Sequence, residues 1–387
     1  MLSDPRRLAI VLAGLCCFIN LYATQPLLPL FAREFHASSA QVSMTVSATT
    51  LAVALVAPFI GIVADVFGRK RIIVAALSLL VLPTVLIALS SSLRELVLWR
   101  FVQGLCLPPI FAVIVAYIGD EWPRSEVTGV TSLYMVASGL GGFLGRLLTG
   151  LMTDYWGWRA AFLTIAAITM VSAFIVGFAL SRERRFVGAE NFLHSLQMML
   201  AHFGNPELLT TFMVGFATLF SFVATFTYVN FYLAAPPFNL PASALGSIFV
   251  VYLVAVAVTP LTGGWIRRFG RRALVLVSSV VWCLGLAITL VPWLPAIILG
   301  LAILACAGFT LQTTATSLLA ERAIAARSSA VGIYVSCYYI GGSAGAVAPA
   351  VVWAHAGWLG CVALVSAVLL ATAALAARFW RPTAGGS

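Results

Sequence analysis

The chain has 387 residues, of which 62% are hydrophobic and only 9% are charged, and its formal net charge is +10. Soluble domains carry about 25% charged residues, so this composition excludes a soluble globular protein. In a membrane protein, basic loops and anionic lipid account for the positive charge without a nucleic-acid partner.

Apolar runs of about 20 residues alternate with short polar breaks, which is typical of α-helices crossing a hydrocarbon core roughly 30 Å thick. Barrel strands would be shorter and would alternate in polarity. We therefore predict an all-α membrane protein with twelve transmembrane helices in two six-helix pseudo-symmetric bundles. In chain order the predicted spans are 8–32, 41–63, 72–90, 96–119, 127–152, 160–180, 209–234, 242–265, 273–292, 296–319, 328–353 and 357–377.

The two halves of the chain resemble each other at a shift of about two hundred residues. The stretch "YMVASGLGGFLG" at 134–145 aligns with "YVSCYYIGGSAG" at 334–345. A parallel repeat of six helices is the layout of a carrier whose binding site lies between two bundles. The predicted domains are an N-terminal bundle at 1–180, a cytoplasmic linker at 181–208 and a C-terminal bundle at 209–387.

The linker places apolar residues at helical spacings, namely Phe192, Leu196, Met199 and Phe203. This pattern predicts a helix lying on the membrane surface, and an ordinary linker with some helix is the alternative.

Basic residues concentrate in alternate loops, and such residues are enriched in cytoplasmic loops. One side carries the N-terminal arginines, the clusters at 69–71 and 267–272, and the C-terminal arginines, whereas the other carries Arg33, Arg94 and Arg159. We predict that both termini are cytoplasmic.

Two basic motifs occupy equivalent loops of the halves: "GIVADVFGRKR" at 61–71 and "GGWIRRFGRR" at 263–272. Their glycines permit a tight turn, and an aspartate at a helix end can meet a neighbouring arginine or helix N-terminus. A bridge formed in one conformation only would gate the cytoplasmic side, whereas the alternative is that the basic residues merely set topology. The predicted gating residues are Gly61, Asp65, Gly68, Arg69, Gly263, Arg267, Gly270 and Arg271.

The charges inside the spans are Arg100 and Arg146, whereas all twelve acidic residues fall in loops or at helix ends. Counted at 1.5 Å per residue, Arg100 lies about 7 Å from Glu95 and Arg146 about 12 Å from Asp154 along their helices. Charges in lipid are costly and usually functional. We predict a coupling or substrate-charge role for Arg100, Arg146 and Asp154, with snorkelling of both arginines to the surface as the alternative.

The first motif is similar to the loop between helices 2 and 3 of the major facilitator superfamily, in particular its drug:proton antiporter group of bacterial inner-membrane efflux carriers. "RFVQG" at 100–104 is similar to the helix-4 signature of that group. "GLGGFLGRLLTG" at 139–150 resembles its helix-5 motif, with Arg146 in place of proline and Thr149 in place of glycine.

The resemblance implies that the substrate cavity is lined by helices 1, 4, 7 and 10. Polar residues among aromatic ones suit a small, partly apolar solute, although each can instead form an interhelical hydrogen bond. The predicted cavity residues are Asn20, Tyr22, Gln25, Gln103, Tyr228, Asn230 and Gln312.

Enzyme chemistry finds no support in the sequence. The seven cysteines lie within apolar spans without metal-ligand spacing, and we find neither a phosphate-binding loop nor a nucleophile or zinc motif. We predict no enzymatic activity, no cofactor, no metal and no nucleic-acid partner.

We predict a monomeric secondary transporter of the bacterial inner membrane that exports a small-molecule substrate against protons, with membrane lipid as its surroundings. Proton relays generally use Asp, Glu or His, and the lack of a mid-span carboxylate weakens the proton assignment; Asp65, Asp120, Glu126 and Asp154 remain possible carriers. The first alternative is a carrier of anions, sugars or metabolites that uses Arg100 and Arg146, and the second is a membrane sensor without flux.

Overall fold

A computed structural model describes residues 4–181, 204–322 and 327–380, with the side chains of Ile62, Asp65 and 327–329 outside the description. All regular secondary structure in these ranges is helical, as predicted. The expected surface helix of the linker falls on residues 182–203, which are outside the described residues.

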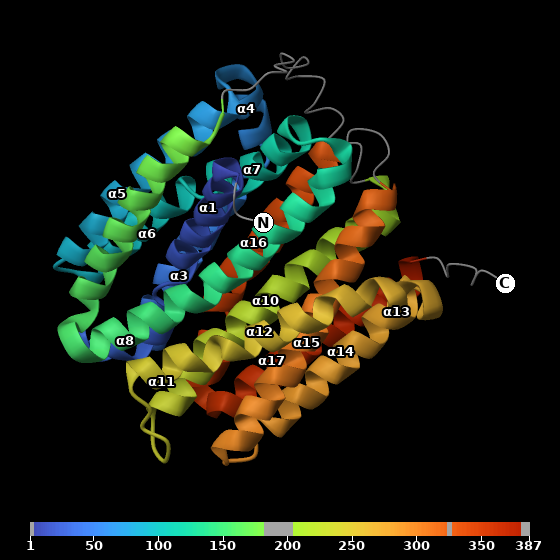
Figure 1. Ribbon diagram of the computed structural model, residues 1–387. Helices are drawn as coiled ribbons and strands as arrows, with labels where there is room; N and C mark the ends of the chain where they lie inside the picture. The colour runs from blue at the N-terminus through green and yellow to red at the C-terminus, as the bar shows by residue number, and fades with distance from the viewer. Residues whose placement is uncertain (1–3, 182–203, 323–326, 381–387) are drawn as a thin grey trace. The chain divides into compact units, whose positions relative to one another are not determined.

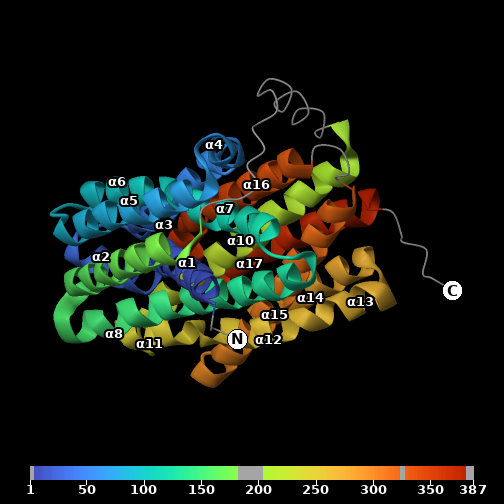
Figure 2. The same cartoon turned by 45° about the horizontal axis from the view of Figure 1, so that its top comes forward.

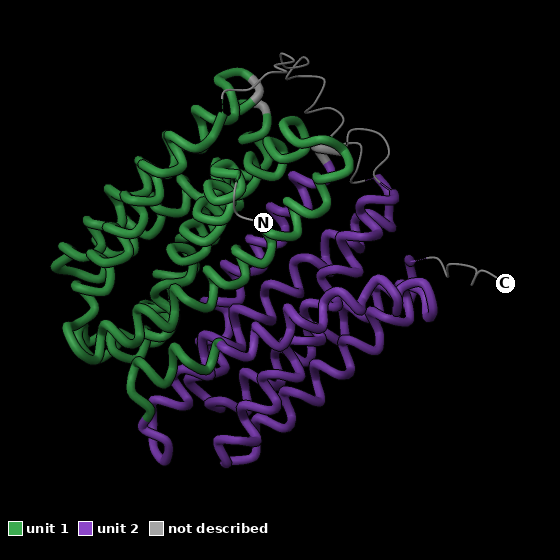
Figure 3. The backbone as a smooth tube through the Cα atoms, viewed as in Figure 1, with its two compact units in different colours: residues 1–192, 240–249 green, residues 193–239, 250–387 purple. Residues whose placement is uncertain are grey.

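The chain forms two compact units, which Figure 3 colours separately. Unit 1 comprises residues 1–192 and 240–249, and unit 2 comprises residues 193–239 and 250–387. Residues 240–249 therefore pack with the first unit, although they follow the first helix of the second half.

Unit 1 is a bundle of helices in which α1 lies beside α8, as Figures 1 and 2 show. Its elements are α1 (Pro5–Leu21), η1 (Gln25–Leu27), α2 (Leu28–Glu34), α3 (Ser39–Val56), α4 (Ile60–Phe67), α5 (Arg69–Leu89), α6 (Leu93–Leu105), α7 (Pro108–Glu121), α8 (Arg124–Ala179) and α11 (Ala242–Ser247). The short η3 (Ile248–Val250) follows α11 and crosses the boundary to unit 2.

Unit 2 repeats this plan, with α10 packed against α16 as α1 is against α8. Its elements are α10 (Pro206–Ala234), α12 (Val251–Val258), η4 (Thr259–Leu261), α13 (Thr262–Phe269), α14 (Arg271–Ile288), α15 (Leu294–Arg322), α16 (Arg327–Val347) and α17 (Pro349–Phe379).

Helix starts follow from local sequence. Asp4 caps α1 by accepting a hydrogen bond from the Arg6 amide at 2.9 Å, and Arg6 holds the pKa of this carboxyl below its usual range. Ser38 and Gln41 form a reciprocal capping box at α3. Asn205 accepts from two amides of the first turn of α10. Each cap satisfies amides that the helix itself cannot pair.

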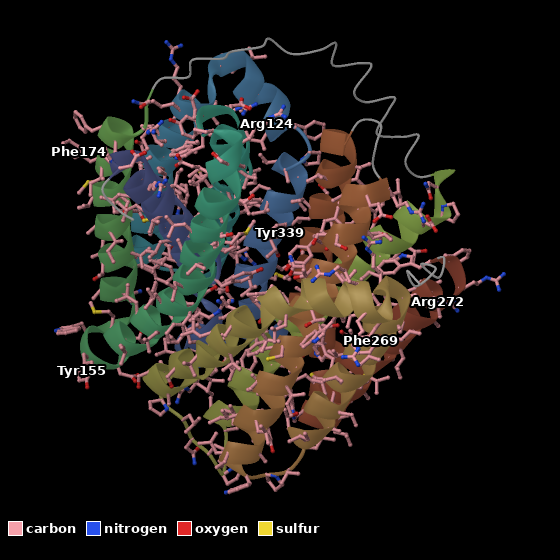
Figure 4. The ribbon with its side chains drawn as sticks, turned by 45° about the vertical axis from the view of Figure 1, so that its right-hand side comes forward. Arg124, Tyr155, Phe174, Phe269, Arg272 and Tyr339 are labelled. Atoms are coloured by element: carbon pink, nitrogen blue, oxygen red, sulfur yellow. The ribbon has the colours of Figure 1, made fainter. Side chains whose placement is uncertain are left out.

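The described residues contain eleven helical segments long and apolar enough to cross a membrane. One of them is the 56-residue α8, which at 1.5 Å per residue is far longer than a bilayer core of roughly 30 Å. It turns at Gly157, whose φ is 82°, and therefore supplies two of the predicted spans. Tyr155, labelled in Figure 4, is 75% exposed at this turn. Twelve crossings result, as predicted.

Several spans predicted as continuous are instead broken. Breaks separate α1 from η1, α3 from α4, α6 from α7, and α16 from α17, and η3 and η4 interrupt the span at 242–265. Most of these breaks coincide with a proline, such as Pro26, Pro58 and Pro108. Proline removes a backbone donor and clashes with the preceding turn, although Pro83 is accommodated inside α5.

The internal repeat extends to packing. A Cβ atom at Gly145 would lie 2.5 Å from the Ile19 carbonyl oxygen of α1, and one at Gly345 would overlap the Phe220 carbonyl oxygen of α10 in the same way. Both glycines thus allow helix backbones to approach closely, as small residues do in membrane bundles.

Candidate functional site

Arg100 is completely buried in unit 1, at the point where α1 ends. Its guanidinium donates hydrogen bonds to the carbonyl oxygens of Asn20 at 2.8 Å, Leu21 at 2.5 Å and Thr45 at 3.1 Å. It also donates to Oε1 of Gln103. All these partners are neutral oxygens, and no ion pair of Arg100 occurs among the described residues.

The break in α1 explains this arrangement. The last carbonyls of a helix have no intrahelical donor and carry the negative end of its dipole. Arg100 reaches from α6 to the carbonyls of Asn20 and Leu21 and so satisfies them. The side chain does not snorkel to the surface; it joins α1, α3 and α6.

Asn20 and Gln103 belong to the same buried network. Nε2 of Gln103 donates to Oδ1 of Asn20 and to Oγ1 of Thr84, both at 2.8 Å. Nδ2 of Asn20 donates to Oγ1 of Thr169 at 3.0 Å. These two predicted cavity residues therefore connect α1, α5, α6 and α8 by hydrogen bonds.

Arg146 lies on a continuous stretch of α8 and is 2% exposed. Its Nε donates to Oε1 of Gln25 at 2.8 Å, and its Nη1 to the Gly142 carbonyl at 2.5 Å. The guanidinium carbon lies 4.5 Å from the ring centre of Tyr22 and 4.4 Å from that of Phe249. The cation is thus flanked by two aromatic faces. Like Arg100, it approaches the broken segment that follows α1.

Close packing of α8 against α11 brings Phe249 to Arg146. A Cβ atom at Gly246 would overlap the Arg146 carbonyl oxygen, and one at Gly150 would overlap the Ala242 carbonyl oxygen. Asp154 accepts a hydrogen bond from the Ser243 amide at 2.9 Å. Asp154 therefore lies at the N-terminus of α11. Among the described residues, no ion pair joins it to Arg100 or Arg146.

None of the nine acidic residues whose side chains the structure describes is buried. Asp120 pairs with Arg69, and Glu126 pairs with Arg7 at 2.5 Å. Glu95 is exposed and accepts hydrogen bonds from Ser91, which lower the pKa of its carboxyl. The side chain of Asp65 is outside the description.

The predicted cavity residues of unit 2 make contacts of their own. Tyr228 is buried and donates to the Ala346 carbonyl at 3.1 Å, between α10 and α16. Asn230 is also buried and donates to the Phe226 carbonyl at 2.8 Å. Gln312 is half-buried and accepts from the Tyr338 hydroxyl at 2.8 Å.

The two predicted gating motifs form equivalent turns. Gly68 and Gly270 have φ of 90° and 76°, a region that L side chains rarely adopt. Arg69 pairs with Asp120 at the end of α7, and Arg271 pairs with Glu321 at 2.6 Å, near the end of α15. Each pair lies within one unit.

The other motif residues differ in their surroundings. Lys70 donates to the Leu180 carbonyl at the end of α8. Gly61, Gly263 and Arg267 are exposed.

Sequence reasoning missed several partners: Asp120 and Glu321 of the ion pairs, Thr45, Thr84 and Thr169 of the network, and Phe249 beside Arg146. Asp120 and Glu321 stand 201 residues apart, and Arg69 and Arg271 stand 202 residues apart. Because both pairs follow the shift of the internal repeat, the alignment of the two halves could have indicated these ion pairs. The partners of Arg146 come from three separate elements, and no local pattern links them.

Comparison with known proteins identifies the architecture. The family model described as Major Facilitator Superfamily matches residues 10–238 and 215–386. The chain is 30% identical to the inner membrane transport protein YnfM of Escherichia coli K12, covering 97% of this chain and 90% of the relative. It is 30% identical to the uncharacterized MFS-type transporter YybF of Bacillus subtilis, covering 92% and 89%.

The fold matches that of the xylose transporter XylE from E. coli in its inward-open conformation. The TM-score is 0.77 at 16% identity, covering 98% of this chain and 97% of that one. With a matching family model over nearly the whole chain and full-length bacterial relatives, this protein belongs to the Major Facilitator Superfamily and is a multi-pass secondary transporter of the inner membrane, not an enzyme.

Proposed function

We propose that the protein exports a small neutral or anionic organic solute by alternating access, coupled to protons. One observation carries the proposal: a desolvated arginine, Arg146, stands beside Gln25 between the rings of Tyr22 and Phe249. A fixed positive charge disfavours a cationic solute, and aromatic faces favour planar apolar groups. This selectivity separates the protein from a cation-exporting carrier.

The proposed binding wall is the segment around the break in α1. Tyr22 and Gln25 contact Arg146. Asn20 and Gln103 are held in the Arg100 network, so their proposed contribution is to fix the shape of this segment. Within unit 2, Gln312, Tyr228 and Asn230 are proposed as substrate contacts.

Proton coupling is proposed to use a carboxylate at a helix end. Asp120 and Glu126 each pair with an arginine, whereas Asp154 accepts from a backbone amide. Asp154 is therefore the preferred carrier among the described carboxylates, because its protonation does not break an ion pair that the structure shows.

Anion exchange is the second candidate function, favoured by the exposed or half-buried state of all nine described acidic side chains. In that case Arg146 alone would hold the substrate. The donors of Arg100 already bond to four neutral oxygens, which leaves it in a structural role.

The test begins with a thermal-shift screen of purified protein against cationic, neutral and anionic organic compounds. Hits are then added to proteoliposomes that enclose a pH-sensitive dye. We expect neutral or anionic hits, and a pH change on their addition that an ionophore abolishes. If a gradient of a second solute drives the flux and the internal pH does not change, the protein is an exchanger and proton coupling is contradicted. Flux confined to cations would contradict the role of Arg146.

A further inference from the structure

The two gating motifs differ in charge at two equivalent positions. Aligned on Gly68 and Gly270, the first copy has Asp65 where the second has Arg267. The second copy also has Arg268 where the first has Val66. The turn between α13 and α14 is therefore purely basic, which topology alone does not require.

Among the described residues, few carboxylates lie at the end of unit 2 that contains the turn between α13 and α14. Six arginines gather at the ends of α13, α14, α15 and α17: Arg267, Arg268, Arg271, Arg272, Arg322 and Arg378. Two glutamates lie at the same end, and both are engaged, Glu321 by Arg271 and Glu207 by Arg322 at 3.1 Å. Arg267, Arg268, Arg272 and Arg378 have no carboxylate partner within residues 204–322 and 327–380.

At the corresponding end of unit 1, three arginines have a carboxylate partner. Arg6 pairs with Asp4, Arg7 with Glu126 and Arg69 with Asp120. Arg71 and Arg124 at this end have no carboxylate partner among the described residues, so the four such arginines of unit 2 form the larger group.

Large apolar side chains adjoin the unpaired arginines. Phe269 is 55% exposed and Leu261 is 56% exposed, and the guanidinium of Arg268 lies 5.2 Å from the Phe269 ring centre. Figure 4 labels Phe269 and Arg272, which stand one residue before and two residues after Gly270 in the chain. A surface that joins exposed apolar groups to arginines at a helix end matches the boundary between acyl chains and headgroups.

We propose that the turn between α13 and α14 binds an anionic phospholipid, with Arg267, Arg268 and Arg272 on the headgroup phosphate and Phe269 and Leu261 against its acyl chains. Arginine suits phosphate because its planar donors bind two oxygens at once. Zwitterionic lipid carries no net charge to compensate the cluster. None of the three arginines belongs to the proposed binding wall, and Arg267 is shared with the second gating motif.

The experiment titrates phosphatidylglycerol or phosphatidylcholine into the purified full-length protein and counts bound lipids by native mass spectrometry. The variant is Arg267→Gln/Arg268→Gln/Arg272→Gln. Its control, Arg33→Gln/Arg94→Gln/Arg159→Gln, removes the same charge at exposed arginines of the opposite predicted side. Each arginine near an anionic surface contributes about 1 kcal/mol, so each substitution should weaken phosphatidylglycerol binding about fivefold.

We expect the loss in the cluster variant and not in the control, with phosphatidylcholine binding unchanged in both. Equal affinities of the cluster variant and the control for phosphatidylglycerol would overturn the site. Inorganic phosphate added alone should not displace the lipid, and displacement by it would assign the cluster to free phosphate. If the triple variant does not fold, the single variants Arg268→Gln and Arg272→Gln should each bind phosphatidylglycerol about fivefold more weakly. Unchanged binding in both single variants would equally overturn the site.

Discussion

At the scale of single residues, Arg146 is the group whose charge the proposed transport requires. Arg146→Gln keeps some hydrogen bonding but removes the charge, and Arg146→Lys keeps the charge but loses the planar fork. We expect the Gln variant to abolish solute flux in proteoliposomes and the Lys variant to retain part of it, with normal expression of both. Normal flux in the Gln variant together with loss in the Lys variant would contradict the charge argument.

Arg100 is predicted to act on stability instead. Arg100→Gln leaves the carbonyls of Asn20, Leu21 and Thr45 without their donor. A buried polar group left unpaired costs about 1–3 kcal/mol, so the variant should unfold at a clearly lower temperature in detergent. The control Arg94→Gln, at an exposed position, should change this temperature little. A native-like unfolding temperature for Arg100→Gln would show that water replaces these bonds.

At the scale of helices, α8 depends on glycine where it crosses α1. In Gly145→Ala the new methyl group would meet the Ile19 carbonyl at 2.5 Å, whereas a methyl group at Gly129, on the same helix, would have no neighbouring atom within 4 Å. Overpacking typically costs about 1–3 kcal/mol, and an exposed glycine-to-alanine change in a helix gains up to about 1 kcal/mol. Thermal unfolding should therefore shift down for Gly145→Ala and slightly up for Gly129→Ala.

The same experiment examines the internal repeat. Gly345 contacts Phe220 of α10 as Gly145 contacts Ile19 of α1, so Gly345→Ala should match Gly145→Ala in direction. A neutral effect at Gly345 would mean that unit 2 tolerates a wider helix crossing.

At the scale of the whole molecule, the proposed gate gives Asp65 and Arg69 different roles. Arg69 pairs with Asp120 inside unit 1, and a bond within one rigid bundle does not change as the bundle moves. We propose that the state-dependent contact is made instead by Asp65 and the turn at Gly68. Asp65→Ala and Gly68→Val should insert normally but suppress flux, whereas Arg69→Gln should mainly lower stability. Unchanged flux in both of the first two variants would reduce the motif to a topology signal.

Orientation in the membrane is predicted from the arginine distribution. Single cysteines placed at 235–241 and 293–295 should react with an impermeant thiol reagent added to intact cells. Cysteines at 182–190 and 267–272 should react only after permeabilisation, because basic loops remain in the cytoplasm. External labelling at 267–272 would reverse the orientation.

The sequence by itself determined the class of protein, the number of spans and the repeat. These features depend on composition and on the length of apolar runs, because a bilayer requires about 20 apolar residues for each helical crossing. It also singled out Arg100, Arg146 and the two glycine-turn motifs, since charge in lipid and glycine at a turn are rare enough to be noticed. The prolines at the breaks, Pro26, Pro58 and Pro108, are also visible in the sequence, but hydropathy averaged over about 20 residues does not detect a break of a few residues.

Only the tertiary structure decided what those residues do within the fold. Arg100 and Arg146 have the same charge and lie in consecutive membrane spans, yet one bonds to the carbonyls that end α1 and the other stands between Tyr22 and Phe249. Their partners come from helices far apart in the chain, and hydropathy carries no information about which side chain meets which carbonyl. The cost of burying a charge makes some partner obligatory, and the packing of α1, α6, α8 and α11 selects it.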